Sequence, residues 1–481
     1  MKCKWAFLLF AFSLFGLLLM GCQPGKNGGS NLSGRVMLEG ESSHGGIIVQ
    51  LFGHGSNEPI WAITSAHPCI GFPYSPAADF DWRLQQPLYV TTTDAAGNYT
   101  FSDVPDGMYI FSARRDSFGW SAPVTAAVQG GDASVGTVTL FRETFFSFQS
   151  LEVNTTFLED HHYVFSGIVN VPEDVTLTIQ PGAVLRFEQD RWLVVSGTLI
   201  ADGTPENWIV WTCHSDTIIS AHWNMLQFSS TATTPSLSYN RVEGAHQGIN
   251  SAKGGGLFDH CFFRKVNAEG LTISGAGPRV MNCIFLDIGG NGMVVNTASN
   301  ADIQSNLFYR NGFYGLVVFD WNGGLIHNNW LERCGTEGSG NEGGIHILLS
   351  NDVRFTHNQV IRCRHGIYFG SRCDSTNLIQ ANVFSDLFKG IYVGFTQDNT
   401  GASYPSIHYN CMRNLESYCV HIGSCQFNRG HNLQVEQNYW GTTSEAAVNE
   451  CMWDARDEED CPFLFVNPFL TSCPDSAGIT C

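Results

Sequence analysis

A repeated pattern of apolar and polar positions runs from Leu237 to Trp440. Each copy reads apolar-x-x-[Asn or Cys]-x-apolar, followed by a second phrase, Gly-apolar-x-apolar, and successive copies lie 21 to 29 residues apart. The fourth position of the first phrase is occupied in turn by Asn240, Cys261, Cys283, Asn306, Asn329, Asn358, Asn382, Asn410 and Asn438. Self-similarity at such a period predicts a solenoid in which each copy forms one coil.

The pattern favours a parallel β-helix over a leucine-rich repeat, which also carries an Asn after alternating apolar residues. Ile, Val and Phe dominate the apolar positions, and the second phrase is β-like where a leucine-rich repeat would need a helix. We expect the Asn side chains to stack into a hydrogen-bonded ladder, because a buried amide must find partners. The Gly of the second phrase is expected to allow a tight turn. It occurs as Gly248, Gly270, Gly292, Gly315, Gly344, Gly366 and Gly390, with Cys419 in the last copy.

The residue two positions after each of these Gly should point away from the core, because side chains alternate along a strand. In the last four copies this position and the one before the Gly carry mostly aromatic, His and Lys side chains. The predicted ligand-binding set is His346, His365, Tyr368, Lys389, Tyr392, Tyr418 and His421. Aromatic rings at strand spacing suit the flat faces of sugars. The alternative is that these rings only stabilise the sheet by packing on one another.

The N-terminal part of the chain has a different pattern, in which residues 31–141 alternate like short strands. The phrases at Asp94–Phe101 and Val104–Tyr109 resemble those of carboxypeptidase-regulatory-like, transthyretin-like modules. The resemblance implies a seven-stranded β-sandwich that spaces or supports a neighbouring domain. A long insertion, Gly55–Pro87, departs from that family.

Two further stretches, Val175–Thr212 and Asn438–Ala446, resemble the first and closing coils of secreted β-helix proteins of the pectate-lyase-like superfamily. The predicted fold is therefore all-β: a small β-sandwich followed by a right-handed parallel β-helix over residues 150–450 and a Cys-rich C-terminal cap over residues 451–481. Lyases, hydrolases, epimerases, adhesins and proteins of no known activity share this fold, so the fold alone names no reaction.

The first residues predict export. Two lysines precede the apolar run Trp5–Met20, which is the pattern of a secretory signal. The ending LMGC resembles the lipobox of bacterial lipoproteins, and the resemblance implies a signal peptide over residues 1–22 with lipid on Cys22. Residues 23–30 would then be a linker. We expect a monomer at the cell envelope, on the outer membrane or cell surface, that contacts the membrane only through its lipid.

The chain carries 25 Lys+Arg against 44 Asp+Glu, a formal charge of −19. We find no basic face in the sequence, which argues against nucleic acid as a partner. The same charge repels acidic polysaccharides unless a local basic patch or a divalent cation intervenes. No cofactor or metal site is predicted. The acidic run Asp454–Asp460 has the charge for Ca²⁺ but lacks the spacing of a calcium loop, so a solvated loop is preferred.

Export also permits disulfides. Cys334 and Cys363 each lie five residues past a rung of the ladder, one coil apart, and coils about 4.8 Å apart meet the Cα distance of a disulfide. The other candidates lie in the C-terminal segment and are Cys451, Cys461, Cys473 and Cys481. Cys261 and Cys283 are neighbours in the ladder, where two small buried thiols are at least as good an interpretation as a disulfide.

The sequence favours binding of a glycan or surface partner along the helix flank, without catalysis. The alternative is a polysaccharide lyase on the same face, with Tyr392 or His421 as the base and Lys389 neutralising a uronate carboxylate. The outward columns lack the acidic residues of a calcium-dependent lyase and the paired Asp of a polygalacturonase. A purely architectural surface protein is the third interpretation. The sequence leaves open which ligand binds and whether the Gly-rich segment 335–344 covers the face.

Overall fold

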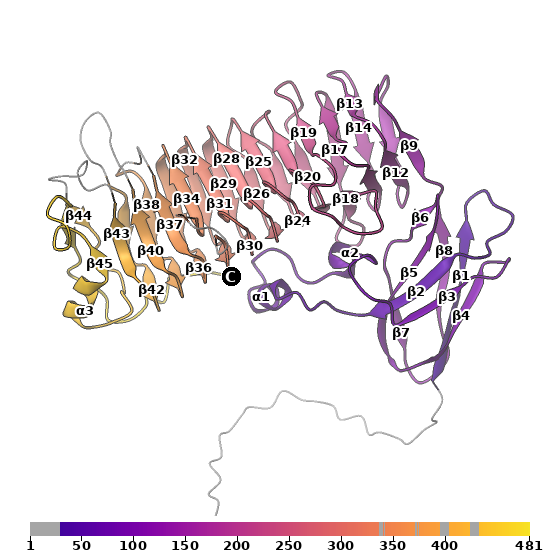
Figure 1. Ribbon diagram of the computed structural model, residues 1–481, viewed down its shortest axis with the longest axis horizontal. Coiled ribbons are helices and arrows are strands. Elements are labelled where there is room, and N and C mark those ends of the chain that lie inside the picture. The colour runs from indigo at the N-terminus through magenta and orange to yellow at the C-terminus, as the bar shows by residue number, and fades with distance from the viewer. Residues whose placement is uncertain are drawn as a thin grey trace, which may run out of the picture.

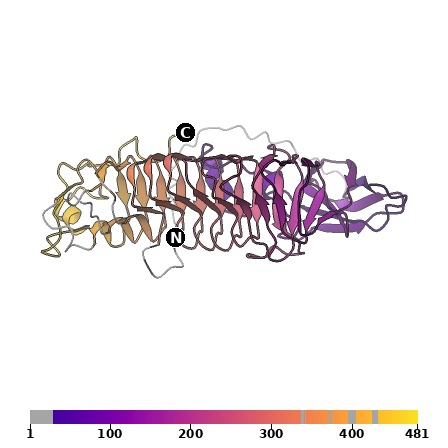
Figure 2. The same cartoon turned by 90° about the horizontal axis from the view of Figure 1, so that it is seen from above.

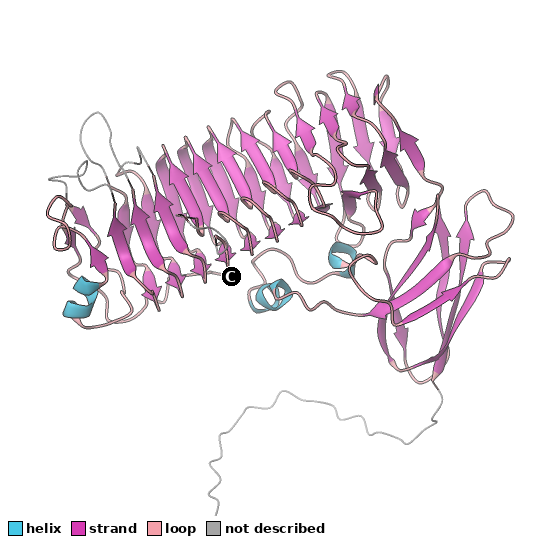
Figure 3. Cartoon of the chain, viewed as in Figure 1, coloured by secondary structure: helices cyan, strands magenta, loops and turns pink. Residues whose placement is uncertain are grey.

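Two all-β units make up the protein in this computed structural model, which describes residues 29–335, 340, 342–370, 373, 375–394, 404–423 and 432–481. An N-terminal sandwich lies beside one end of a long parallel β-helix (Figures 1 and 3). Seen from above, the coils stack along one axis and the sandwich lies at the N-terminal end of that axis (Figure 2). The predicted fold class is confirmed. Cys22 and half of the predicted covering segment 335–344 lie outside the described residues.

Two antiparallel sheets form the sandwich, with one parallel pair between β1 and β8. The first sheet has three strands, β1 (Ser30–Leu38), β4 (Asn98–Val104) and β8 (Ala133–Leu140). The second has five, β2 (Ile48–Gly53), β3 (Tyr89–Thr92), β5 (Gly107–Arg115), β6 (Gly119–Trp120) and β7 (Val124–Val128). The sandwich thus has one strand more than the resemblance implies. Its core is the inward set of the alternating residues, including Leu32, Val49, Tyr99 and Phe111.

Three long parallel sheets form the helix, because each coil adds one strand to each sheet. Sheet I contains β10 (Gln149–Ser150), β13 (Val169–Val171), β16 (Leu193–Val195), β19 (Leu226–Phe228), β22 (Ile249–Ser251), β25 (Leu271–Ser274), β28 (Met293–Asn296), β31 (Leu316–Phe319), β34 (Ile345–Leu348), β37 (His365–Phe369), β40 (Lys389–Val393), β43 (Tyr418–Ile422) and β45 (Met452–Trp453).

Sheet II contains β11 (Thr155–Phe157), β14 (Thr176–Ile179), β17 (Thr198–Asp202), β20 (Ser236–Ser238), β23 (Leu257–Asp259), β26 (Arg279–Met281), β29 (Ser299–Gln304), β32 (Asn322–His327), β35 (Asn351–Thr356), β38 (Leu378–Gln380) and β41 (Ser406–His408). Sheet III contains β9 (Thr144–Phe146), β12 (His162–Phe165), β15 (Val184–Phe187), β18 (Ile209–Cys213), β21 (Asn240–Glu243), β24 (Phe262–Arg264), β27 (Ile284–Leu286), β30 (Leu307–Tyr309), β33 (Trp330–Glu332), β36 (Gln359–Ile361), β39 (Val383–Ser385) and β42 (Cys411–Arg413).

The Asn ladder lies at the turn between sheets II and III and is continuous from Asn306 to Asn438. The side-chain oxygen of Asn329 accepts from the backbone N–H of Asn306 at 3.0 Å and from its side-chain amide at 3.0 Å. The same two bonds recur at each later step. Cys283 joins the ladder through its backbone N–H, which donates to Asn306 Oδ1 at 2.9 Å. Because every rung is fully buried, the ladder satisfies backbone groups that the turn would otherwise leave unpaired.

The Gly that opens each strand of sheet I is required for a different reason than a tight turn. None of these glycines has a left-handed backbone conformation. A Cβ at Gly366 would lie 2.4 Å from the carbonyl oxygen of Gly390, and one at Gly390 would lie 2.5 Å from that of Cys419. The residue is Gly because successive coils approach too closely there for any side chain.

The insertion of the sandwich extends along the helix flank (Figure 1) and carries α1 (Ile60–Ala66) and α2 (Pro76–Asp79). It is fixed there by a buried cluster of three Arg and three carboxylates. Arg83 from the insertion contacts Asp81 at 2.7 Å and Glu243 of β21 at 3.1 Å. Arg264 of β24 contacts Glu243 at 2.7 Å and Asp79 at 3.4 Å. The sixth member is Arg241, which contacts Asp81 at 3.6 Å.

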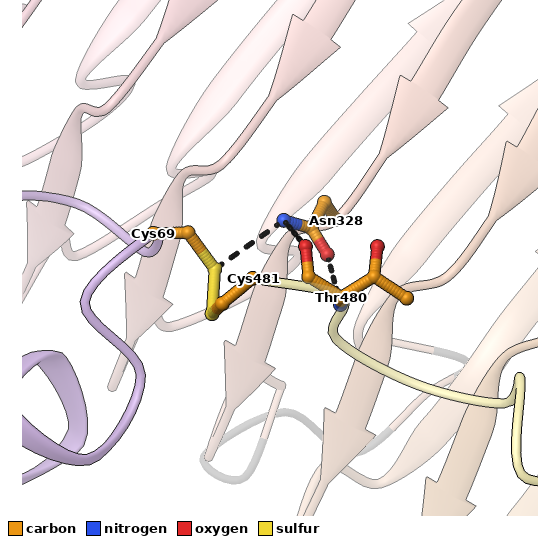
Figure 4. Close-up of a disulfide and its surroundings, with 4 residues drawn as sticks. All are labelled: Cys69, Asn328, Thr480 and Cys481. Atoms are coloured by element: carbon orange, nitrogen blue, oxygen red, sulfur yellow. Dashed lines mark hydrogen bonds between the residues drawn. A yellow bond between two sulfur atoms is a disulfide. The ribbon is translucent and has the colours of Figure 1, made fainter.

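The C-terminal segment covers the last coil with α3 (Glu445–Glu450), with β45 and with a two-stranded sheet of β44 (Leu433–Gln434) and β46 (Leu464–Phe465). The chain then runs back along the helix to Cys481, which forms a disulfide with Cys69 of the insertion (Figure 4). Cys473 forms a second disulfide with Cys411, and Cys461 is also disulfide-bonded. Among the described residues, no helix is long and apolar enough to cross a membrane.

The predicted disulfide between Cys334 and Cys363 is wrong, because both residues are buried free thiols, and Cys451 is also free. The two side chains follow the same inward direction in successive coils, so they stack instead of converging. Cys363 Sγ accepts from the backbone N–H of Cys334 at 3.4 Å, as an Asn rung would. Cys261 and Cys283 are thiols with the same contact, also at 3.4 Å.

Candidate functional site

Sheet I places the predicted outward residues in one column, because parallel pairing in register stacks the same position of every coil. His346 of β34 pairs with Tyr368 of β37, which pairs with Tyr392 of β40. Tyr392 in turn pairs with His421 of β43. These four side chains form what we call the aromatic column.

The rings of the column contact one another. Those of Tyr368 and Tyr392 are parallel, with centroids 4.9 Å apart and planes at 15°. Tyr392 and His421 follow at 5.0 Å, and His346 meets Tyr368 edge-on at 4.5 Å. All four side chains are half-buried. The column therefore stabilises the sheet by ring packing and still exposes part of its ring surface to a ligand.

A second set of glycines lies beneath the Tyr rings of the column, where the absence of a side chain allows each ring to pack on the sheet. A Cβ at Gly423 would be 2.0 Å from the hydroxyl oxygen of Tyr392, and one at Gly394 would be 3.1 Å from that of Tyr368. Each Tyr thus leans over the next coil, at a position that only Gly leaves free. Each of these glycines follows the column residue of its own coil by two positions, so the spacing marks them in the sequence.

The column is longer than predicted, because Trp453 of β45 pairs with His421. The two rings are nearly parallel, with centroids 5.4 Å apart and planes at 19°. Tyr418 meets both at its edge, at 5.2 Å and 5.3 Å. Trp453 was missed because the chain leaves the repeat before it reaches β45, so no spacing identifies it.

The prediction that His365 lies on the surface is wrong, because only 2 % of the residue is exposed. It lies between the ring of Phe388 at 6.1 Å and that of Tyr392 at 6.4 Å. Neither ring nitrogen has a hydrogen-bond partner among the described residues. Burial, together with the nearby Lys389 and Arg364 charges, lowers the pKa of His365 to about 4. His365 is therefore neutral at pH 7 and supports the column from below.

The residues of the alternative lyase site do come together. The Lys389 ammonium lies 5.2 Å from the centre of the Tyr392 ring, and His421 lies on the next strand. Burial and the neighbouring Tyr368 raise the pKa of Tyr392. Burial, with the charges of Lys389 and His365, lowers the pKa of His421 to about 4. A protonated phenol and a weakly basic imidazole are poor acceptors for a carbon-bound proton.

The acidic run of the C-terminal segment is used in folding. Asp454 is completely buried, and its carboxylate accepts from Arg456 at 2.9 Å and from the backbone N–H of Leu464 at 3.0 Å. Across the part of the chain that the structure describes, no group of three His, Cys, Asp or Glu side chains could hold a metal ion.

The fold and its outward column define a right-handed parallel β-helix protein. Residues 224–384 match the family model described as right handed beta helix region, and residues 335–452 match that of the periplasmic copper-binding protein NosD. The matches support an extracellular or periplasmic β-helix protein. No curated protein and no solved structure matches the chain significantly.

The copper named in the second description finds no fitting site in the described residues. A copper centre needs His, Cys or Met ligands that converge on one point. In the matched stretch, His346, Tyr368, Tyr392 and His421 stand one per coil in a row, so the imidazoles are separated by phenol rings. The thiols of Cys334 and Cys363 point into the packed interior. In the described part of this stretch, no three His, Cys, Asp or Glu side chains converge, so these residues do not assemble a ligand set for copper.

Proposed function

We propose that this protein is an exported, lipid-anchored surface protein that binds a glycan along the outer face of sheet I without changing it chemically. The observation that carries the proposal is the aromatic column, in which Tyr368, Tyr392, His421 and Trp453 occupy one position of four consecutive strands. The coil spacing of about 4.8 Å offers a ring surface to successive units of a linear chain.

The chemistry of the column fits a sugar ligand better than an apolar one. The exposed surface of half-buried rings accepts contacts from the C–H groups of pyranoses, and the Lys389 ammonium beside the Tyr392 ring can donate to hydroxyl or carboxylate oxygens. The raised pKa of Tyr392 and the lowered pKa of His421 favour binding over proton abstraction.

The test uses the soluble chain from Gln23 onward and a panel of plant, algal and bacterial polysaccharides, read for both retention and release of unsaturated products. We expect retention without products, and its loss in the Tyr368→Ala/Tyr392→Ala variant. The matched control is Val294→Ala/Val317→Ala, which shortens side chains at the same strand position, two to four coils away from the two Tyr. Release of unsaturated products would show that the protein is a polysaccharide lyase. Lys389, Tyr392 and His421 would then be substituted one at a time. If the chain neither retains a polysaccharide nor releases products, an architectural role is the remaining interpretation.

The lipid anchor rests on the residue pattern that ends at Cys22. We expect the full chain to partition into the detergent phase and the Cys22→Ser variant into the aqueous phase. Aqueous partition of both would contradict the anchor.

A further inference from the structure

Three arginines line a groove on the helix that belongs to neither the aromatic column nor the core. Arg310, Arg333 and Arg362 occupy the same position of three consecutive coils, at the turn that follows each strand of sheet III. The backbone N–H of Arg310 donates to Glu332 of the next coil at 3.0 Å, and that of Arg333 donates to Ile361 at 3.2 Å. The turn therefore stacks one guanidinium per coil, at the coil spacing of about 4.8 Å.

The conformation of these residues is unusual for arginine. Arg310, Arg333 and Arg362 have φ of 55°, 55° and 51°, in the left-handed region that Asn and Asp enter more readily than long side chains. The coils on either side carry Asp287 and Asp386 at this position. Arginine is disfavoured in this backbone conformation, yet it occurs there in three successive coils. This indicates that the guanidinium groups have a function at these positions.

The guanidinium groups are available to a ligand. Arg333 is exposed, and among the described residues its guanidinium has no hydrogen bond or ion pair, only the ring of Tyr309 at 5.9 Å. The side chain of Arg362 is 53 % exposed and contacts the buried Glu332 through one nitrogen. Arg310 contacts Asp287 at 2.6 Å and Glu58 of the insertion at 2.8 Å. Arg310 also donates to the second carboxylate oxygen of Asp287 at 2.9 Å. Because a guanidinium has five N–H donors, most donors of Arg333 and Arg362 stay free, whereas Arg310 is largely engaged by the two carboxylates.

The groove itself is large enough for a ligand. Arg310, Arg333 and Arg362 line a hollow of about 550 Å³ together with Asp287 and Asn311. Asp287 also lines an adjacent hollow of about 650 Å³. The wall of this second hollow is formed partly by the sandwich insertion, with Ser56, Asn57, Gln85 and Gln86. The same hollow is also lined by the carboxylates of Glu58, Asp79 and Asp287 and by Arg264 and Lys265. The three arginines are thus followed along one side of the helix by a mixed polar surface in which the insertion supplies amides, a hydroxyl and two of the carboxylates.

We propose that this groove binds an anionic glycan, with its carboxylate or sulfate groups on Arg333 and Arg362 and its hydroxyl groups along the insertion. The planar fork of arginine binds such oxyanions through two parallel hydrogen bonds, and amide side chains are the usual partners of sugar hydroxyls. The guanidinium of Arg333, which has no ion pair among the described residues, and the exposed part of Arg362 supply the local positive charge that a chain of charge −19 needs to hold a polyanion. The site is independent of the aromatic column, so either can fail without the other.

The experiment measures binding of the soluble chain to dextran sulfate, polygalacturonate and uncharged dextran by affinity electrophoresis and calorimetry. We expect the anionic polymers to bind and dextran not to bind in the groove. Arg333→Ala/Arg362→Ala should weaken binding at least about tenfold, as expected for loss of charged hydrogen bonds. Arg333→Lys/Arg362→Lys keeps the charge but loses the fork and should fall between. Comparison of the two anionic polymers distinguishes sulfate from carboxylate as the bound group.

The matched control is Arg354→Ala, which removes an equally exposed arginine (64 % of its side chain) from sheet II. It should change binding less than about twofold, and thermal melting should show that all variants are folded. Equal binding of dextran and dextran sulfate, equal losses in Arg354→Ala and the double variant, or equally effective competition by inorganic sulfate would each overturn the proposal. Tyr368→Ala/Tyr392→Ala should keep the preference for anionic polymers, which separates this test from that of the aromatic column.

Discussion

We expect the disulfide between Cys69 and Cys481 to stabilise this protein more than any other single bond does. It joins residues 412 positions apart. A crosslink stabilises mainly by restricting the unfolded chain, and the chain-entropy relation gives about 6 kcal/mol for a loop of this length. The disulfide between Cys411 and Cys473 closes a separation of only 62 residues, for which the same relation gives about 4 kcal/mol. Both values are upper bounds, because residual structure in the unfolded state lowers them.

The assay is guanidinium unfolding of the soluble chain followed by tryptophan fluorescence. Cys481→Ser should lower the midpoint more than Cys473→Ser, and a reductant should lower the midpoint of the unchanged chain further than that of either variant. The control is Asn328→Ala, which keeps the bridge but removes two hydrogen bonds to Thr480, of 2.7 Å and 3.2 Å (Figure 4). That loss should cost about 1–2 kcal/mol. A cost of Cys481→Ser no larger than that of Asn328→Ala, or a larger cost for Cys473→Ser, would refute the entropic reasoning.

Three further changes test other parts of the structure. Glu243→Gln should destabilise the protein by about 3–5 kcal/mol in denaturant titrations, because it leaves buried arginines short of one carboxylate; no change would show that the cluster contributes nothing. Burial lowers the pKa of His162 to about 3 and that of His365 to about 4, below the ordinary value near 6.5. Protons therefore bind the unfolded chain in preference to the folded one as the pH falls below about 6.5. The free energy of unfolding should decrease there by about 1.4 kcal/mol per pH unit for each of the two histidines. His365→Phe should make this slope shallower, and an unchanged slope would contradict its burial as the cause. Gly423→Ala should weaken retention of the glycan more than Gly394→Ala. The new Cβ would lie 2.0 Å from the Tyr392 hydroxyl in the first variant and 3.1 Å from the Tyr368 hydroxyl in the second. Equal effects would contradict the view that these glycines position the two rings.

The ladder and the outward column could be predicted because every coil repeats the same constraint. A buried amide such as Asn358 needs partners in every coil, and a strand fixes which side chain points outward, so register follows from spacing. The burial of His365 could not be predicted, since it depends on how Phe388 and Tyr392 pack around it. Trp453 lies beyond the last repeat, where no periodicity constrains the chain.

The disulfide pairing could not be predicted from the sequence either. Sequence spacing suggested Cys334 with Cys363, which are one coil apart, but stacked side chains run parallel and do not converge. The actual partners Cys69 and Cys481 are brought together because the tail returns along the last coils of the helix, past Val383 to Asn328. No local pattern records that path, because it depends on where two non-repeating segments dock on the solenoid.

That docking connects stability with the proposed anionic site. The insertion that supplies Glu58 to Arg310 packs on the helix through a buried apolar cluster that includes Trp61 and Phe72. It is also held by the buried charge cluster around Glu243 and by the backbone bond from Gly71 to Ser305 of 2.7 Å, and the disulfide at Cys69 joins it to the C-terminal tail. The aromatic column, in contrast, lies on sheet I and depends only on coil stacking. Loosening of the insertion therefore opens one wall of the arginine groove and leaves the column unchanged. Reduction of the disulfide should for this reason weaken the binding of anionic glycans before it affects ligands of the column.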